Sequence, residues 1–223
     1  MKKLYASMIL NALIVIFVIF GCIIMFAGLQ FMGEGRILSE TGVYMLKFYT
    51  VDSNILAGLS SILLLVHQFY IIKGATRRIP VAVMIFKQIT TVALTITFLV
   101  TLFYLAPFSP YGFFSLYLNA NLFFHLIVPV LAIISYVFFE KYKNDTEYAW
   151  WGLSTMIIYI TYYLTNIIAH IAENNIPKYD FYGFTNGNLR NIAVIVPIFL
   201  LLTYWVSDGL IRLNLKFSKY RLK

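Results

Sequence analysis

Six stretches of the chain are long and apolar enough to cross a lipid bilayer, and the short connections between them leave no material for a water-soluble domain. A transmembrane helix needs about 20 mostly apolar residues. Only 12% of the residues are charged and 61% are hydrophobic, whereas a soluble domain carries about 25% charged residues. The sequence therefore predicts one all-α, six-helix transmembrane domain over residues 1–223, with spans at about 6–28, 46–72, 80–106, 116–139, 149–172 and 190–212.

The basic residues indicate the direction of the spans, because Lys and Arg accumulate in cytoplasmic loops. Only Arg36, Lys47, Lys178 and Arg190 lie at one set of span ends. This distribution predicts that both termini are cytoplasmic and that the chain is a multi-pass protein of the cell membrane. It also explains the net charge of +8 through topology and anionic lipid rather than nucleic acid. The basic residues at the other set of ends are Lys2, Lys3, Lys73, Arg77, Arg78, Lys141, Lys143, Arg212, Lys216, Lys219, Arg221 and Lys223.

The second span opens with an unusual concentration of polar side chains in the stretch KFYTVDSNIL. Thr50, Ser53 and Asn54 are spaced i, i+3, i+4, so they share one face of a helix, whereas Asp52 points elsewhere. Transfer of a polar group from water to hydrocarbon costs several kcal/mol unless the group finds a hydrogen-bond partner. The cost is about 4–8 kcal/mol in a fully apolar solvent. These residues are therefore candidates for a functional site.

Two further spans carry polar pairs with helical spacing, Asn121 with His125 and Asn166 with His170. At about 1.5 Å per residue, all three groups lie roughly 5–15 Å below the outer surface. Because lipid exposure of all of them would be costly, we expect them to face one another around a cavity.

Each of these residues also has a purely structural interpretation. The hydroxyls are able to bond to their own helix backbone, as Ser and Thr in membrane helices do. The asparagines are suited to hydrogen bonds between helices, and the histidines to packing or to the interface. The shared depth is what favours a functional interpretation.

A metal site is the less favoured alternative. His125 and His170 lack an evident third ligand, although Asp52 would complete a set that zinc accepts. We expect neither a metal nor another cofactor.

A second polar group lies toward the cytoplasmic side and consists of His67, Lys87, Gln88 and Asp208. Lys87 is about two turns inside the third span. We expect it to form a structural ion pair with Asp208, and a proton or ion relay is the alternative.

A hydroxyl beside an imidazole is the minimal nucleophile and base for acyl transfer. Thr50 would need a base such as His125 to take its proton during attack on a carbonyl. An amide such as that of Asn54 or Asn121 would then stabilise the oxyanion. An apolar bundle would admit an acyl chain from the lipid, so a lipid ester is the expected substrate.

The same two segments resemble motifs of the androgen-induced gene 1 family (FAR-17a/AIG1-like), whose members are six-span membrane proteins. In KFYTVDSN, Thr50 and Asn54 match its second-span motif. In NLFFHLIVP, Asn121, His125 and Pro129 match its fourth-span motif. In length and number of spans the resemblance covers nearly the whole chain, and it suggests a distant bacterial branch.

The resemblance implies a hydrolase of fatty acid esters of hydroxy fatty acids, with Thr50 as nucleophile and His125 as base. Related membrane proteins use Cys to transfer acyl groups, but the single cysteine of this chain, Cys22, lies in a different span.

Two other classes of function stay open. A small proton-coupled carrier would use Asp52, His125, His67, Lys87 and Asp208 as a relay across the membrane. A continuous polar path would favour it, and an apolar layer between the two polar groups would count against it. A noncatalytic lipid-binding protein would need only the structural interpretations.

Overall fold

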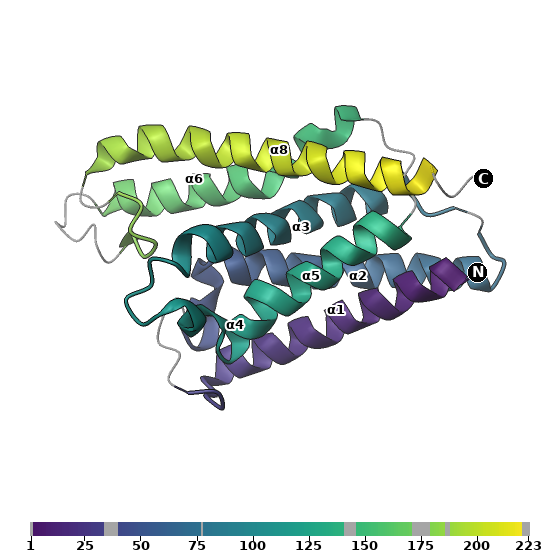
Figure 1. The fold of residues 1–223 in the computed structure, drawn as a ribbon, viewed down its shortest axis with the longest axis horizontal. Helices are drawn as coiled ribbons and strands as arrows, with labels where there is room; N and C mark the ends of the chain where they lie inside the picture. Colours follow the sequence, from purple (N-terminus) through teal and green to yellow (C-terminus); the bar gives the residue numbers. More distant parts are fainter. Residues whose placement is uncertain are drawn as a thin grey trace.

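The structure is a computed structural model that describes residues 2–33, 40–76, 78–140, 146–170, 179–185 and 188–219. Within these ranges every regular element is a helix (Figure 1). Six of the helical stretches are long and apolar enough to span a membrane, which confirms the predicted all-α, six-span architecture. They are Lys2–Ala27, Tyr49–Ile72, Val81–Leu105, Ala120–Phe139, Glu147–Ala169 and Leu189–Phe217.

Helix α3 (Val81–Val100) lies at the centre of the bundle. It contacts α2 (Tyr49–Ile72), α5 (Val128–Ile134), α6 (Ser154–Ala169) and α8 (Ile192–Lys219). Its most apolar window is 61% buried, whereas no other span exceeds 50%. This central position explains why a span rich in threonine is tolerated there, because its polar face meets protein rather than lipid.

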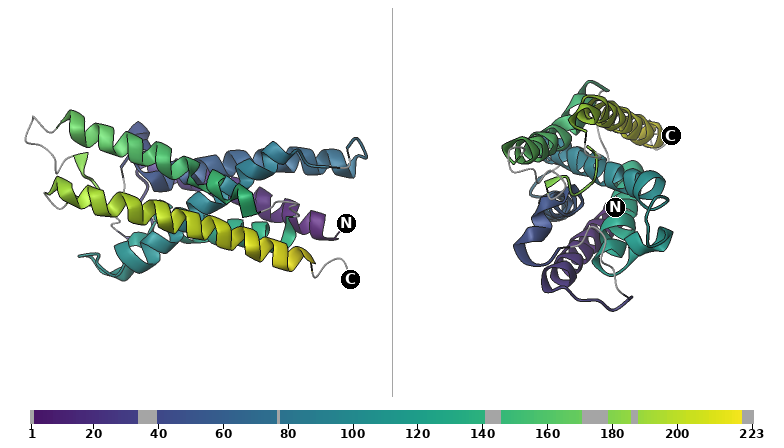
Figure 2. Two further views of the ribbon diagram at one scale, coloured as in Figure 1. Left: turned by 90° about the horizontal axis from the view of Figure 1, so that it is seen from above. Right: turned by 90° about the vertical axis from the view of Figure 1, so that its left-hand side faces the viewer.

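The other helices flank α3 on two sides. Helices α6 and α8 pack together on one side, and α1 (Lys2–Ala27) packs on α2 and α5 on the other (Figures 1 and 2). The two described ends of the chain lie at the same end of the bundle, as an even number of spans requires (Figure 1). The cytoplasmic location of that end stays a prediction from the basic residues.

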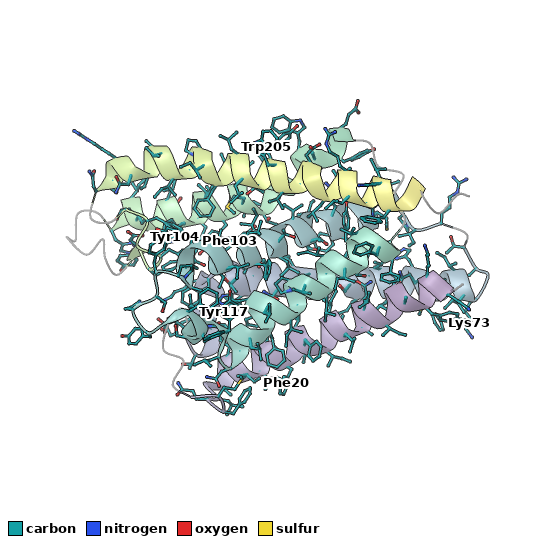
Figure 3. The ribbon with its side chains drawn as sticks, in the orientation of Figure 1. Phe20, Lys73, Phe103, Tyr104, Tyr117 and Trp205 are labelled. Carbon is teal, nitrogen blue, oxygen red and sulfur yellow. The ribbon has the colours of Figure 1, made fainter. Side chains whose placement is uncertain are left out.

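The lateral surface of the bundle is apolar. Phe20 and Trp205 project away from it (Figure 3), and 69% of the Trp205 side chain is exposed. A monomeric soluble protein rarely exposes large contiguous patches of this kind, so the surface fits a multi-pass membrane protein.

The predicted start of the fourth span, at 116, lies outside the spanning helix. Residues Phe113–Tyr117 form the short 3₁₀ helix η3, and Asn119 then adopts a φ of 53°. Among residues other than glycine, asparagine is one of those found most often at positive φ. Its side chain accepts the N–H groups of Phe31 and Met32 and donates to the Gly33 carbonyl. An apolar window covers the η3 residues as well, so hydropathy alone places the boundary too early.

The fourth span alternates between α and π geometry, in the order α4 (Ala120–Leu122), η4 (Phe123–Ile127), α5 and η5 (Ser135–Phe139). In the π turn η4, the Val128 N–H bonds to the Phe123 carbonyl five residues earlier. The next bond of that kind would join residue 129 to the Phe124 carbonyl, but Pro129 has no N–H. The Phe124 carbonyl needs another donor because it is buried.

Asn54 of α2 supplies the missing donor. Its Nδ2 group donates to the Phe124 carbonyl at 3.2 Å and to the Thr50 carbonyl at 2.7 Å. The Asn54 side chain is fully buried. The amide therefore fixes the start of α2 against the irregular part of the fourth span.

An apolar layer of side chains from α1, α2, α3 and the fourth span lies near the middle of these helices. All of its members are at most 5% exposed. Along α2 the layer lies between Asn54 and Ser60, and along α3 it lies between Thr90 and Thr97. Its buried residues are Ile14, Val18, Ala57, Leu94, Val128 and Ala132.

We expect Asn54→Leu to lower the free energy of unfolding by about 1–3 kcal/mol, because the Phe124 carbonyl loses its side-chain donor in a buried position. In a Pro129→Ala background the loss should be smaller, since residue 129 then carries an N–H for the same carbonyl. Denaturant unfolding of the four variants in detergent micelles measures this coupling.

Asn166→Leu is the matched control. Asn166 donates only to the Tyr162 carbonyl of its own helix, and it is partly exposed, so its loss should stay within about 0.5 kcal/mol. If Asn54→Leu lowers the free energy of unfolding equally with Pro129 and with Ala at position 129, Asn54 does not replace the N–H that Pro129 lacks.

Candidate functional site

An apolar cavity of about 70 Å³ lies between α2, α3, α6 and α8, at the end of the bundle opposite the termini. Its walls include Ile96, Met156, Leu164 and Phe199. Thr50 lines the same cavity from the first turn of α2. The cavity therefore combines hydrocarbon walls with a hydroxyl that belongs to the polar start of the second span.

Three tyrosines surround this polar edge. The Tyr182 hydroxyl accepts the Tyr49 N–H at 3.0 Å and also interacts with the hydroxyls of Thr50 and Tyr159. The Tyr159 hydroxyl in turn donates to the Lys47 carbonyl at 2.6 Å. Burial raises the pKa of Tyr182 to about 12. A tyrosine phenol is protonated at neutral pH even at its ordinary pKa of about 10, so Tyr182 is able to act as a hydrogen-bond donor beside Thr50.

A larger space, about 710 Å³, lies between α2 and α6. Asp52 and Ser53 line it from α2, and Thr155 lines it from α6. Tyr49 and Tyr159 line both this space and the smaller cavity, and their ring centroids are 5.0 Å apart. The two rings therefore form part of the wall between the two spaces.

The segment 179–185 contributes Tyr182 and Phe184 to the cavity wall. Asp180 holds this segment in place. Its carboxylate accepts the N–H groups of Phe184 and Thr185 at 2.9 and 2.8 Å, as well as the hydroxyls of Thr185 and Tyr163. Asp180 is only 7% exposed. One buried carboxylate thus positions a loop that carries two of the cavity residues.

His125 lies in the π turn η4 and is buried, with 1% exposure. Its Nδ1 bonds to the Leu116 carbonyl at 2.7 Å. A carbonyl only accepts, so Nδ1 carries the hydrogen, and in the neutral ring Nε2 is then the basic nitrogen. Within the described residues no hydrogen bond joins His125 to Thr50, and none of residues 120–139 lines the Thr50 cavity.

Asn54 and Asn121, the residues expected to stabilise the oxyanion, make other contacts in the structure. Both hydrogens of the Asn54 amide bond to backbone carbonyls, so Asn54 orients the two segments in this conformation. Asn121 lines a separate small pocket, which Gly28 and Asn119 also line. Ser53 bonds to the Thr50 carbonyl and to Thr97.

Asn166 and His170, the polar pair of the fifth span, do not contact these residues in the described structure. Asn166 donates to the Tyr162 carbonyl, and His170 bonds to the Asn166 carbonyl while stacking on Tyr179 at a centroid distance of 3.6 Å. Neither residue lines one of the three pockets. Among the described side chains, no group of three His, Cys, Asp or Glu residues gathers as metal ligands would.

The expectation that all the polar groups surround one cavity is therefore wrong. They share a depth, but the rotation of each helix about its own axis directs them to different neighbours. Thr50 lines the small cavity, Asp52 and Ser53 line the larger one, and Asn121 lines a third pocket.

The expected ion pair between Lys87 and Asp208 is also wrong. Asp208 pairs with Arg212, one turn further along α8, at 2.6 Å. Lys87 donates to Ser61 at 2.8 Å. His67 bonds to the Leu63 carbonyl of its own helix. Asp208 has a basic residue at position i+4, and this local partner satisfies it.

Sequence analysis missed the tyrosine cluster and Asp180. The available signal was the stretch YDFYGF (179–184), which is unusually rich in aromatic residues for a connection between spans. Its packing into the bundle depends on long-range contacts, which spacing along the chain does not reveal.

Comparison with known proteins finds no matching family model, no matching curated protein and no matching solved structure.

We expect Asp180→Ala to release the segment 179–185, because it removes the acceptor of two backbone N–H groups. Hydrogen–deuterium exchange at Phe184 and Thr185 should accelerate, while exchange within α3 stays unchanged. Asp208→Ala is the control, since among the described residues Asp208 pairs with Arg212 of its own helix. Unchanged protection in Asp180→Ala would show that the aromatic contacts alone hold the segment.

Proposed function

We propose that this protein is an intramembrane hydrolase of lipid esters in which Thr50 is the nucleophile and His125 the general base. One observation carries the proposal: the Thr50 side chain lies at the polar edge of a cavity whose other walls are mainly hydrocarbon. Such a cavity suits an acyl chain with its ester carbonyl at the hydroxyl, and it disfavours polar solutes.

Tyr182 supports the chemistry from the other side of Thr50. An ester carbonyl develops negative charge on its oxygen during attack, and a fixed donor at that oxygen lowers the barrier. The Tyr182 phenol keeps its proton at neutral pH, as an ordinary tyrosine does, and burial raises its pKa further, to about 12. In this proposal Tyr182 takes the role of oxyanion donor that sequence analysis assigned to the asparagines.

His125 has the tautomer that a general base requires, although it does not line the Thr50 cavity. With Nδ1–H on the Leu116 carbonyl, Nε2 is the nitrogen that accepts a proton. The Asn54 amide bonds both to the Thr50 carbonyl and to the Phe124 carbonyl, one residue before His125. The two motif segments are therefore neighbours. Catalytic hydrogen bonds often tighten only when substrate is bound.

The reaction proceeds through an acyl-enzyme. Thr50 Oγ1 forms a bond to the ester carbonyl carbon while its proton moves to His125 Nε2. The carbon–oxygen bond of the ester then breaks, and the alcohol leaves with that proton. Water next attacks the acyl-Thr50 ester and releases the fatty acid and free Thr50. The family resemblance adds fatty acid esters of hydroxy fatty acids as the proposed substrate.

A noncatalytic lipid-binding protein is the second candidate, favoured by the lack of a hydrogen bond between Thr50 and His125 in the described structure. The apolar layer that includes Ala57 and Leu94 counts against a carrier pathway between α1, α2 and the fourth span. On α3, the buried hydroxyls of Thr91 and Thr95 lie at the same depth. Acyl lipid that copurifies with an inactive protein would favour the lipid-binding candidate.

We expect Thr50→Ala to reduce the release of fatty acid from a branched lipid ester in micelles by at least about 10³-fold, as loss of a nucleophile does. His125→Gln should reduce it comparably. Thr161→Ala is the matched control, because Thr161 is exposed and donates only to the Ile157 carbonyl. Undiminished turnover in Thr50→Ala would remove the mechanism.

Tyr182→Phe should lower kcat by about 10²–10³-fold and change KM little, because the phenol stabilises the transition state more than the bound ester. Tyr104→Phe, at a position that is 49% exposed, should behave as wild type. An unchanged kcat in Tyr182→Phe would assign the oxyanion to a different donor.

A further inference from the structure

The space of about 710 Å³ between α2 and α6 is a groove on the lateral surface of the bundle, and we call it the α2–α6 groove. Three of its lining residues, Tyr44, Ile158 and Tyr162, are 73%, 70% and 44% exposed. Ile55 and Leu56 of α2 add hydrocarbon walls. Ligand pockets in proteins typically have about 300–1,000 Å³. The groove therefore has room for the headgroup and the first part of the chain of a membrane amphiphile.

One wall of the α2–α6 groove is aromatic. Tyr49 of α2 and Tyr159 and Tyr162 of α6 form this wall, and Tyr44 of η1 (Gly42–Lys47) adds a fourth ring to the lining. The ring centroids of Tyr49 and Tyr159 are 5.0 Å apart, and those of Tyr159 and Tyr162 are 5.9 Å apart. The face of an aromatic ring attracts a cation within about 6 Å of its centroid. The wall is therefore a surface on which a cation is stabilised.

Asp52 gives the groove a negative charge. It lies partly buried in the first turn of α2, where the helix dipole stabilises such a charge. Among the described residues, no hydrogen bond or ion pair reaches its carboxylate. Lys47, which also lines the groove, pairs with Glu40 at 2.6 Å. Within the described part of the chain, the groove therefore carries one negative charge that no ion pair neutralises.

The hydroxyl groups of the groove are already engaged within the protein. The hydroxyls of Tyr49 and Thr155 bond to each other at 3.0 Å, and that of Ser53 bonds to Thr97 at 3.2 Å. The Tyr159 hydroxyl donates to a backbone carbonyl at 2.6 Å. A primary ammonium carries three N–H groups that need acceptors, whereas a quaternary ammonium has none and needs only charge and aromatic faces. The groove therefore matches a quaternary ammonium more closely.

We propose that the α2–α6 groove binds an amphiphile of the surrounding bilayer whose headgroup is a quaternary ammonium. The headgroup lies between the Asp52 carboxylate and the rings of Tyr159 and Tyr162, and the alkyl chain lies along the hydrocarbon walls. Charge complementarity selects this occupant, because an anionic or neutral headgroup would leave the carboxylate uncompensated. The binding site is distinct from the proposed hydrolytic site, since Thr50 lines the smaller cavity.

Binding of radiolabelled dodecyltrimethylammonium to the protein in uncharged maltoside micelles tests the proposal. We expect saturable binding of one probe per protein, which Asp52→Asn weakens by at least about 10-fold, because opposite charges attract more strongly in a partly buried site than in water. Asp208→Asn is the matched control, since Asp208 pairs with Arg212 and does not line the groove. Thr50→Ala should bind the probe as wild type does, which separates this proposal from the hydrolytic one.

Tyr162 provides a second test that does not depend on the folding of Asp52→Asn, because its side chain is 44% exposed. Tyr162→Leu should weaken binding by about 3-fold or more through loss of the aromatic face, whereas Tyr162→Phe should keep the wild-type affinity. Dodecylammonium should bind more weakly than the quaternary probe, and neutral dodecanol should not compete with it.

Three results would each overturn the proposal. The first is equal affinity of wild type and Asp52→Asn for the probe, and the second is equal affinity of Tyr162→Leu and Tyr162→Phe. The third is tighter binding of dodecylammonium than of dodecyltrimethylammonium, which would show that N–H donation rather than the aromatic wall selects the headgroup.

Discussion

The bond from the Asn54 amide to the Phe124 carbonyl is the interaction on which the half of the bundle opposite the termini depends. Pro129 takes a donor away from the π turn of the fourth span, and the low dielectric of a membrane interior makes an unpaired carbonyl expensive. Asn54 donates the hydrogen bond that this carbonyl would otherwise lack, and it also donates to the Thr50 carbonyl. This single requirement explains why two polar motifs in separate spans lie side by side.

The same rule accounts for most of the buried polar residues. Hydroxyls on α3 bond either to their own helix or across to α2, as Thr91 does with the Lys87 carbonyl and Thr90 with Ser60. Asn214 of α8 satisfies the Glu140 and Tyr136 carbonyls where the fourth span ends. Polar residues in this bundle are therefore mainly the means by which irregular helices pack closely without loss of hydrogen bonds.

The proposed hydrolytic site differs from these structural contacts, because its polar groups line a cavity rather than a packed contact between helices. It combines Thr50 and Tyr182 with hydrocarbon walls, which suits chemistry on an acyl chain. Glu140 Oε2, at the other end of the bundle, is buried without a hydrogen-bond donor among the described residues.

The sequence by itself determined the number and the approximate length of the spans, because hydropathy is a local property. It also placed the segments of Thr50 and His125 at the same end of the bundle, where Asn54 bonds to the Phe124 carbonyl. The tertiary structure decided which faces meet, since the rotation of a helix about its axis depends on all of its neighbours. For that reason His125 bonds to Leu116, Lys87 bonds to Ser61 rather than to Asp208, and Tyr182 reaches Thr50 from a distant loop.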